Sequence, residues 1–340
     1  MRHDRFSRTF ALRALALAGI AALGLATIVG SGGGVGFLGS ICDTYPESCM
    51  PPPPVPSATI QPAYVTALVG TPVAYDVDTK NITGTLSYQW ARSSDGGLTF
   101  VPIVGATAAR YTLAGVNLAD DGAVFQVLVS GSTGAVKVPA FSHLAVSATP
   151  GVVFQDTEFA STDWAVSSVA DPGQLPFVHT EEQVETGGNP GAYRAMSFKL
   201  PQGAGAARLF FSTPSAVYDP AVQGEIRLID YAEDCVALQP SDTTYTESGL
   251  VLEQSGRRFV SNTSDICVLR AWKPVAARSS MGVQDFRLFD GPACKPGETC
   301  LDFSATAAPL HFGYWRISFG VPGDFIGHGI DNWKVTVWRK

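Results

Sequence analysis

The sequence contains few of the residue patterns by which enzymes are recognised. It has no G-x-S-x-G nucleophile elbow, no H-E-x-x-H zinc motif and no Walker loop. One of its five histidines, His3, lies in the N-terminal segment, and the others form no recognisable catalytic group. These absences favour a non-catalytic protein.

Positive charge is also scarce. The 23 Lys and Arg are outnumbered by 30 Asp and Glu, which gives a net charge of −7, and four of the arginines lie within residues 1–31. The rest of the chain is therefore still more acidic, and it has no cluster of basic residues. Nucleic acid and anionic membranes are poor partners for such a surface. We expect no nucleic-acid partner, and a membrane contact only through the N-terminal segment.

Long apolar runs are confined to that N-terminal segment. A basic segment with Arg2, Arg5 and Arg8 precedes an apolar stretch from Ala14 to Val29, a pattern typical of an export signal. We predict that residues 1–31 are a signal peptide, with an uncleaved membrane anchor and a lipid attached at Cys42 as the second and third alternatives. Each alternative places the protein in the periplasm, at the cell surface or outside the cell.

The rest of the chain is rich in turn-forming residues, with 35 Gly and 23 Pro. Residues 32–57 are Gly-rich and then Pro-rich, which predicts an extended spacer. Beyond the spacer, short alternating apolar runs separated by turns predict an all-β fold, and the length suits two domains. We place an immunoglobulin-like sandwich at 58–148 and a jelly-roll-like sandwich at 152–340.

The first domain is predicted from one strand and one turn. Tyr88 and Trp90 fall on the same face of a strand, and Asp121-Gly122 leads into a second strand that carries Phe125 and Val127. A buried Trp that faces a strand entered through an Asp-x-Gly corner is the arrangement that closes an immunoglobulin-type core. We therefore expect Trp90 to lie in the core and not to serve as a platform for a ligand.

This segment resembles the bacterial immunoglobulin-like domains of surface proteins. The motifs that carry the resemblance are Tyr88-Gln89-Trp90, Gly105-Ala106-Thr107, Tyr111-Thr112-Leu113 and Asp121-Gly122-Ala123 with Phe125. The inter-sheet cysteine pair of the vertebrate pattern is absent, and apolar residues such as Val73 or Tyr75 and Val127 take its place. The resemblance implies a spacer or an adhesion unit.

The second domain carries eight predicted strands, a number typical of jelly rolls. They are Arg194 to Leu200, Ala207 to Ser212, Gly224 to Ile229, Gly249 to Gln254, Ile266 to Trp272, Asp285 to Phe289, His311 to Phe319 and Trp333 to Trp338. Its opening residues 154–159, the turn 187–194 and the closing residues 329–333 resemble parts of secreted concanavalin-like and galactose-binding-like sandwiches. Members of those families often bind carbohydrate.

That resemblance implies two kinds of site. Exposed aromatic side chains stack on sugar faces, and we predict Trp272, Tyr314 and Trp315 as ligand-binding residues. Tyr314 and Trp315 are neighbours in a strand, so we expect only one of them to be in the core. The chain ends of the domain carry Asp156, Glu158 and Asp331, whose oxygens could hold a structural calcium ion.

A glycosidase is the catalytic alternative. Concanavalin-like retaining glycosidases carry Glu-x-Asp-x-x-Glu on one strand, and here Asp230 and Glu233 have the matching interval. Leu228 stands where the first Glu would be, so the nucleophile is missing. The non-catalytic alternative is that both acids cap the end of a strand and face water.

The six cysteines suggest disulfides in an exported protein better than a zinc site, because no C-x2-C spacing occurs. A nearest-neighbour pairing gives Cys42–Cys49, Cys235–Cys267 and Cys294–Cys300, one of fifteen connectivities. The leading hypothesis is an exported, non-catalytic recognition protein that binds carbohydrate or a cell-surface component. The alternatives are a glycosidase-like hydrolase and a purely structural envelope protein.

Overall fold

The computed structural model describes residues 54–133, 137–160, 163–169, 178–200, 206–238, 245–274, 278–290 and 300–340. The predicted signal segment, nearly all of the spacer and the predicted Cys42–Cys49 pair lie outside these residues. Within them the chain is almost entirely β-strand, as predicted. No helix in this part of the chain is long and apolar enough to cross a membrane.

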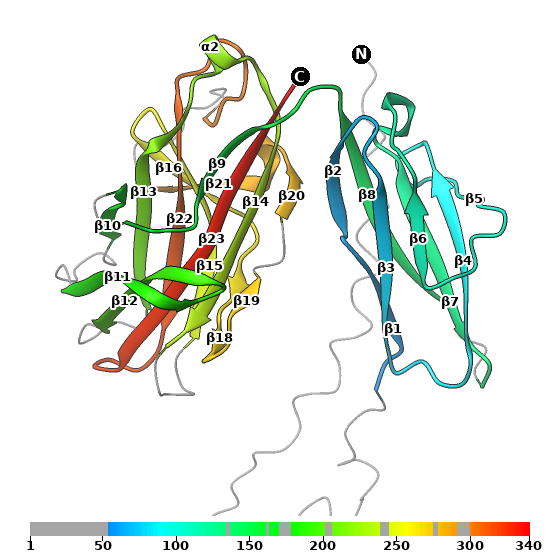
Figure 1. The fold of residues 1–340 in the computed structure, drawn as a ribbon, viewed down its shortest axis with the longest axis horizontal. Helices are drawn as coiled ribbons and strands as arrows, with labels where there is room; N and C mark the ends of the chain where they lie inside the picture. Colours follow the sequence, from blue (N-terminus) through cyan, green and yellow to red (C-terminus); the bar gives the residue numbers. More distant parts are fainter. Residues whose placement is uncertain are drawn as a thin grey trace, which may run out of the picture. The chain divides into compact units, whose positions relative to one another are not determined.

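The first eight strands form an immunoglobulin-like sandwich of two sheets (Figure 1). One sheet contains β1 (Ser57–Gln61), β3 (Val73–Lys80) and β6 (Arg110–Leu113). The other contains, in spatial order, β2 (Tyr64–Leu68), β8 (Lys137–Ser147), β7 (Val124–Gly131), β4 (Leu86–Ser93) and β5 (Val101–Pro102).

Trp90 lies at the centre of this sandwich, which confirms its predicted place in the core. It is fully buried, as are Tyr75, Phe125 and Val127. Its indole N–H donates to the carbonyl of Ala108 at 2.9 Å, so burying the ring leaves no donor unpaired. The ring centroids of Tyr75 and Phe125 are 5.0 Å apart, and these large side chains occupy the space that a disulfide spans in vertebrate domains.

The acidic corner before β7 is a short 3-10 helix, η2 (Leu118–Asp120). Asn117 caps it by accepting the N–H of Ala119, and Asp120 accepts the N–H of Asn117 at 2.9 Å. Asp120 also pairs with Arg92 of β4 at 2.8 Å. The corner thus fixes the entry of β7 opposite the strand that carries Trp90.

The remaining strands form a second sandwich with its own core. One sheet runs, in spatial order, β10 (Ala165–Val169), β13 (Ala206–Tyr218), β22 (Leu310–Phe319), β15 (Tyr245–Gln254), β16 (Arg257–Ser261) and β21 (Phe286–Asp290), with β17 (Asp265–Ile266) on β15. The other runs β11 (His179–Gly188), β12 (Gly191–Lys199), β23 (Phe325–Arg339), β14 (Ile226–Ala237) and β18 (Val268–Leu269). β9 (Val152–Asp156) pairs with β23, and both β19 (Lys273–Pro274) and β20 (Arg278–Met281) pair with β14.

Several elements differ from the sequence prediction. β11 was not predicted, because its sequence His-Thr-Glu-Glu-Gln-Val-Glu-Thr has no apolar alternation. The long strand predicted from Ile266 to Trp272 is instead broken into β17 and β18. The Cys235–Cys267 disulfide is confirmed, and it joins β14 to the residue between these two short strands. Cys300 is also disulfide-bonded, while its predicted partner, Cys294, lies outside the described residues.

β23, red in Figure 1, lies between β12 and β14 and positions most of the second core. Ile326 and Ile330 point inward from its first half, and Trp333 points inward from its second half. A strict two-residue alternation would turn Trp333 outward. The change of phase occurs at Asn332, which has φ = 51°, where β23 has one more residue than β14 between paired positions. The bulge lets both halves of the strand face the same core.

His328 lies on the inner face of β23 and is fully buried. Neither ring nitrogen has a hydrogen-bond partner among the described residues. Burial, assisted by the positive charge of Arg316, holds the pKa of His328 well below 6.5. The folded protein therefore keeps this imidazole neutral where an unfolded chain would protonate it.

We predict that this histidine makes the fold less stable in acid. As pH falls below about 6.5, the unfolded chain gains a proton at His328 that the folded chain does not, so the free energy of unfolding falls. His328→Leu should reduce the slope of the free energy of unfolding against pH by the equivalent of about one bound proton per molecule. Urea unfolding at a series of pH values measures the slope. Equal slopes in the wild-type protein and in His328→Leu would contradict the prediction.

Candidate functional site

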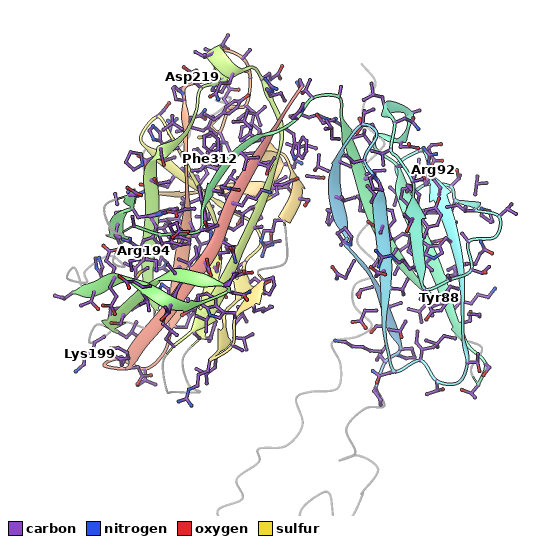
Figure 2. All side chains as sticks on the ribbon, in the orientation of Figure 1. Tyr88, Arg92, Arg194, Lys199, Asp219 and Phe312 are labelled. Carbon is purple, nitrogen blue, oxygen red and sulfur yellow. A yellow bond between two sulfur atoms is a disulfide. The ribbon has the colours of Figure 1, made fainter. Side chains whose placement is uncertain are left out.

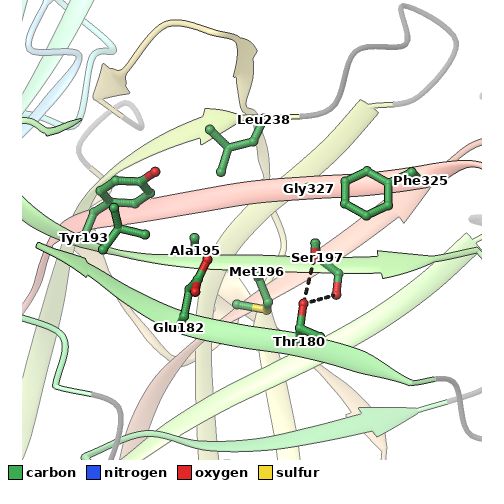
Figure 3. A pocket seen from close by; sticks show the side chains of 10 residues that line it. Thr180, Glu182, Tyr193, Ala195, Met196, Ser197, Leu238, Phe325 and Gly327 are labelled. Atoms are coloured by element: carbon green, nitrogen blue, oxygen red, sulfur yellow. Dashed lines mark hydrogen bonds between the residues drawn. The ribbon is translucent and has the colours of Figure 1, made fainter. Parts of the chain in front are cut away.

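A shallow hollow lies on the outer face of the sheet that contains β11, β12 and β23 (Figure 3). Strand register sets its floor: Ala195 pairs with Gly329, and Ser197 pairs with Gly327. These four residues are small and occupy two adjacent strands. At these positions β12 and β23 therefore carry only small side chains, between larger side chains of neighbouring positions.

Larger side chains surround this floor. Figure 3 shows Tyr193 and Phe325 at opposite ends of the hollow, with Leu238 along one side. Phe325 is 48% exposed, so much of its ring faces solvent. The hollow has a volume of about 210 Å³. That is below the ~300–1,000 Å³ of sites that enclose a drug-sized ligand, so this surface suits a ligand that lies across it.

Trp272 supports the Tyr193 end of the hollow. The two rings meet edge to face with centroids 5.2 Å apart, and the indole N–H of Trp272 donates to the carbonyl of Gly187 at 2.7 Å. Gly329 makes room for both rings, because a Cβ at that position would lie 3.0 Å from the Tyr193 ring and 3.1 Å from Trp272. Trp272 is the one predicted ligand-binding residue that lies next to the hollow.

The polar groups of the hollow come from β11 and β12. The hydroxyls of Thr180 and Ser197 share a hydrogen bond at 2.7 Å. Glu182 is the only charged residue that lines the hollow, and it forms no hydrogen bond or ion pair in the described part of the chain. Burial raises the pKa of Tyr193, and the nearby Glu182 carboxylate raises it further. Tyr193 therefore stays a neutral hydrogen-bond donor over the physiological range.

Beneath the floor, a buried ion pair connects the two sheets of the sandwich. Arg316 of β22 donates to both carboxylate oxygens of Glu233 on β14, at 3.1 and 3.2 Å, and both side chains are fully buried. Tyr231 donates to Glu233 at 2.7 Å, and Arg316 donates to the hydroxyl of Ser248 at 2.8 Å. Burial raises the pKa of Glu233, and Arg316 limits the rise. The bidentate pair fixes how one sheet lies on the other.

The structure corrects the glycosidase alternative. Glu233 points into the core, where Arg316 and Tyr231 occupy its oxygens. Asp230 is on the other face of β14 and accepts the Thr66 hydroxyl, the Ser280 N–H and the Trp338 indole N–H. An interval of three residues places two side chains on opposite faces of a strand. The two carboxylates therefore share no cleft and cannot act together on one glycosidic bond.

Tyr314 and Trp315 are not available to a ligand, which corrects a second prediction. Tyr314 is fully buried between the sheets, where it stacks on Phe211 with centroids 4.4 Å apart. Trp315 points to the opposite face of β22, yet it is only 1% exposed, in a cluster with Phe210 and Val260. Both faces of this sheet are covered at these positions, so both rings are core residues.

Two of the three predicted calcium ligands, Asp156 and Asp331, are occupied by other contacts. Asp156 accepts the N–H groups of Glu158 and Phe159 and the indole N–H of Trp164. Asp331 accepts the N–H groups of Asn189 and Asn332. Within the described ranges, no three His, Cys, Asp or Glu side chains gather in a group that could hold a metal ion. The acids instead fix turns at the ends of β9 and β23.

A second, more polar hollow of about 360 Å³ lies beside β9 and β13. Three of its polar side chains already have partners: Thr213 and Ser215 share a hydrogen bond at 2.9 Å, and Asp156 accepts the indole N–H of Trp164. It has no exposed aromatic side chain comparable to Phe325. The hollow on the β11–β12–β23 face is therefore the stronger candidate site.

Comparisons with known proteins give only distant likenesses. No protein-family model matches the chain, and no curated protein matches it. Among solved structures, the N-terminal four Ig domains of Dscam1 isoform 6.9 match with a TM-score of 0.21 and 20% identity over 27% of this chain and 21% of that one. A marsupial T cell receptor matches with a TM-score of 0.23 and 13% identity over 46% of this chain and 92% of that one. Neither likeness transfers a function to this chain.

We predict that the buried pair beneath the site is strongly coupled. Arg316→Met should lower the free energy of unfolding by about 3–5 kcal/mol, because Glu233 would then be buried without a counter-charge. The double variant Arg316→Met with Glu233→Met should recover most of that loss. Urea unfolding of the single and double variants measures both effects. Arg110→Met removes an exposed Arg–Asp pair and serves as the control, with a small expected effect. A double variant as unstable as Arg316→Met would contradict the coupling.

Proposed function

We propose that this chain is an exported recognition protein that binds carbohydrate without changing it. The observation that carries the proposal is the hollow of Figure 3, in which two aromatic side chains flank a floor of small residues on adjacent strands. The immunoglobulin-like sandwich would then act as a spacer or adhesion unit. As part of the same proposal, we assign the second sandwich to the jelly-roll-like class.

The chemistry of the hollow suits a saccharide. The faces of sugar rings are apolar C–H surfaces that stack on aromatic rings, and their edges carry hydroxyls that need hydrogen-bond partners. Tyr193 and Phe325 supply the rings, and Thr180, Ser197 and Glu182 supply oxygen atoms. The small residues Ala195 and Gly327 in the lining leave room for a ring to lie across the strands.

Two further observations support the proposal. The separation of Asp230 and Glu233 onto opposite faces of β14 removes the one catalytic pair that the sequence offers, which favours binding over hydrolysis. The Cys235–Cys267 disulfide is the kind of cross-link that persists in oxidising compartments outside the cytoplasm. It therefore agrees with the export signal predicted at residues 1–31.

Affinity electrophoresis of the full chain tests the proposal. We expect native gels cast with at least one polysaccharide to retard the wild-type protein without clearing of the gel. Tyr193→Ala and Phe325→Ala should each weaken the retardation by roughly three- to tenfold, because each removes a stacking surface.

Phe141 provides a matched control, since it is 44% exposed against 48% for Phe325 but lies on β8 of the other sandwich. Phe141→Ala should leave retardation unchanged. No retardation on any polysaccharide, or equal loss in the control variant, would overturn the proposal. Clearing of the gel would replace binding by hydrolysis.

A further inference from the structure

We infer that the hollow selects saccharides that carry a protonated amine, with Glu182 as the residue that determines this specificity. The inference rests on the proposed carbohydrate binding and adds the chemical class of the ligand. It is carried by the position of Glu182 and by the absence of a counter-charge for it among the described residues.

Glu182 is placed over the hollow by strand register. It pairs with Ala195 across β11 and β12, and Ala195 pairs in turn with Gly329 on β23. Neither of these two residues has a side chain large enough to cover the carboxylate. Figure 3 shows the carboxylate of Glu182 beside Ala195, between the Tyr193 and Phe325 ends of the hollow. A ligand that stacks on Tyr193 would therefore have the carboxylate at its edge.

The carboxylate is not neutralised by the protein. Arg194 is on the neighbouring strand, but it points inward and pairs with Glu181. Lys199 shares the outer face of β12, yet it is four residues from Ala195, which is about 13 Å at ~3.3 Å per residue. In the described part of the chain, Glu182 therefore has neither an ion pair nor a hydrogen bond.

An unpaired carboxylate beside apolar walls favours one kind of substituent on a sugar ring. A protonated amine would form a charge-assisted hydrogen bond with the exposed carboxylate of Glu182. An N-acetyl group keeps the ring stacking but offers no positive charge. A carboxylated sugar would place two negative charges close together, which costs free energy.

Three oligosaccharides of equal length test this order: glucosamine, N-acetylglucosamine and glucuronate oligomers. Titration calorimetry of the full chain, in mildly acidic buffer where amine and carboxylate are both ionised, should give the tightest binding for glucosamine. We expect it to exceed N-acetylglucosamine by roughly three- to fivefold, with glucuronate weakest, and the difference should shrink as salt is added.

Glu182→Gln should remove the preference, so that the glucosamine oligomer no longer binds more tightly than the N-acetylglucosamine oligomer. An acidic protein attracts cationic oligomers without any specific site, so the control must change the net charge equally. Glu185→Gln does so, because Glu185 is exposed on the same strand and does not line the hollow. We expect Glu185→Gln to keep the wild-type preference.

The outcomes separate the two proposals. Binding of all three oligomers without a preference, or a preference that survives in Glu182→Gln, would overturn the role of Glu182 while the carbohydrate-binding function stands. An equal loss of preference in Glu182→Gln and Glu185→Gln would show that the net charge of the protein causes the preference. That result would also overturn the role of Glu182. The absence of binding to any oligosaccharide, on gels or in the calorimeter, would overturn both.

Discussion

The alternation of β23 is the constraint on which the second sandwich and its candidate site depend. Side chains of a strand point to opposite faces in turn, so burying Ile326, His328 and Ile330 sends residues 327 and 329 outward. Both are glycines: Gly327 lines the hollow, and the missing side chain at Gly329 leaves the space in which Tyr193 and Trp272 pack. The same strand pairs with β12, β14 and β9, so the core and the floor of the hollow are positioned by one element.

Rigidity beneath this floor comes from a polar core as well as an apolar one. Glu233 and Arg316 connect the two sheets, and Arg194, labelled in Figure 2, points inward from β12 to Glu181. Buried charged groups have strict geometric requirements, because each must find its partner or lose the free energy of hydration. Such a core restricts how the sheets can slide. A surface hollow that is one strand layer away keeps its shape for the same reason.

The immunoglobulin-like sandwich could be predicted in detail because its core residues are large and alternate cleanly. Tyr88, Trp90, Phe125 and Val127 identify two strands that pair in one sheet, without help from distant parts of the chain. The second sandwich was predictable only as a class. β11 carries half of the polar groups of the site, yet it has the composition of a loop, and it becomes a strand because it pairs with β12 along its length. That pairing depends on tertiary structure, and the local sequence of β11 does not indicate it.

Two of the three predicted ligand residues, Tyr314 and Trp315, were wrong for a related physical reason. The prediction took each sheet to have one solvent-exposed face, so we expected either Tyr314 or Trp315 to be exposed. Both faces of β22 are covered at these two positions. Alternation could have excluded the Asp230–Glu233 pair from the sequence alone, since three residues along a strand reverse the face. The same rule gives the site its signal: Gly-x-Gly within an apolar strand, opposite Ala-x-Ser on its neighbour. A binding surface on a sheet is recognised as much by the side chains missing from its floor as by the aromatic rings at its ends.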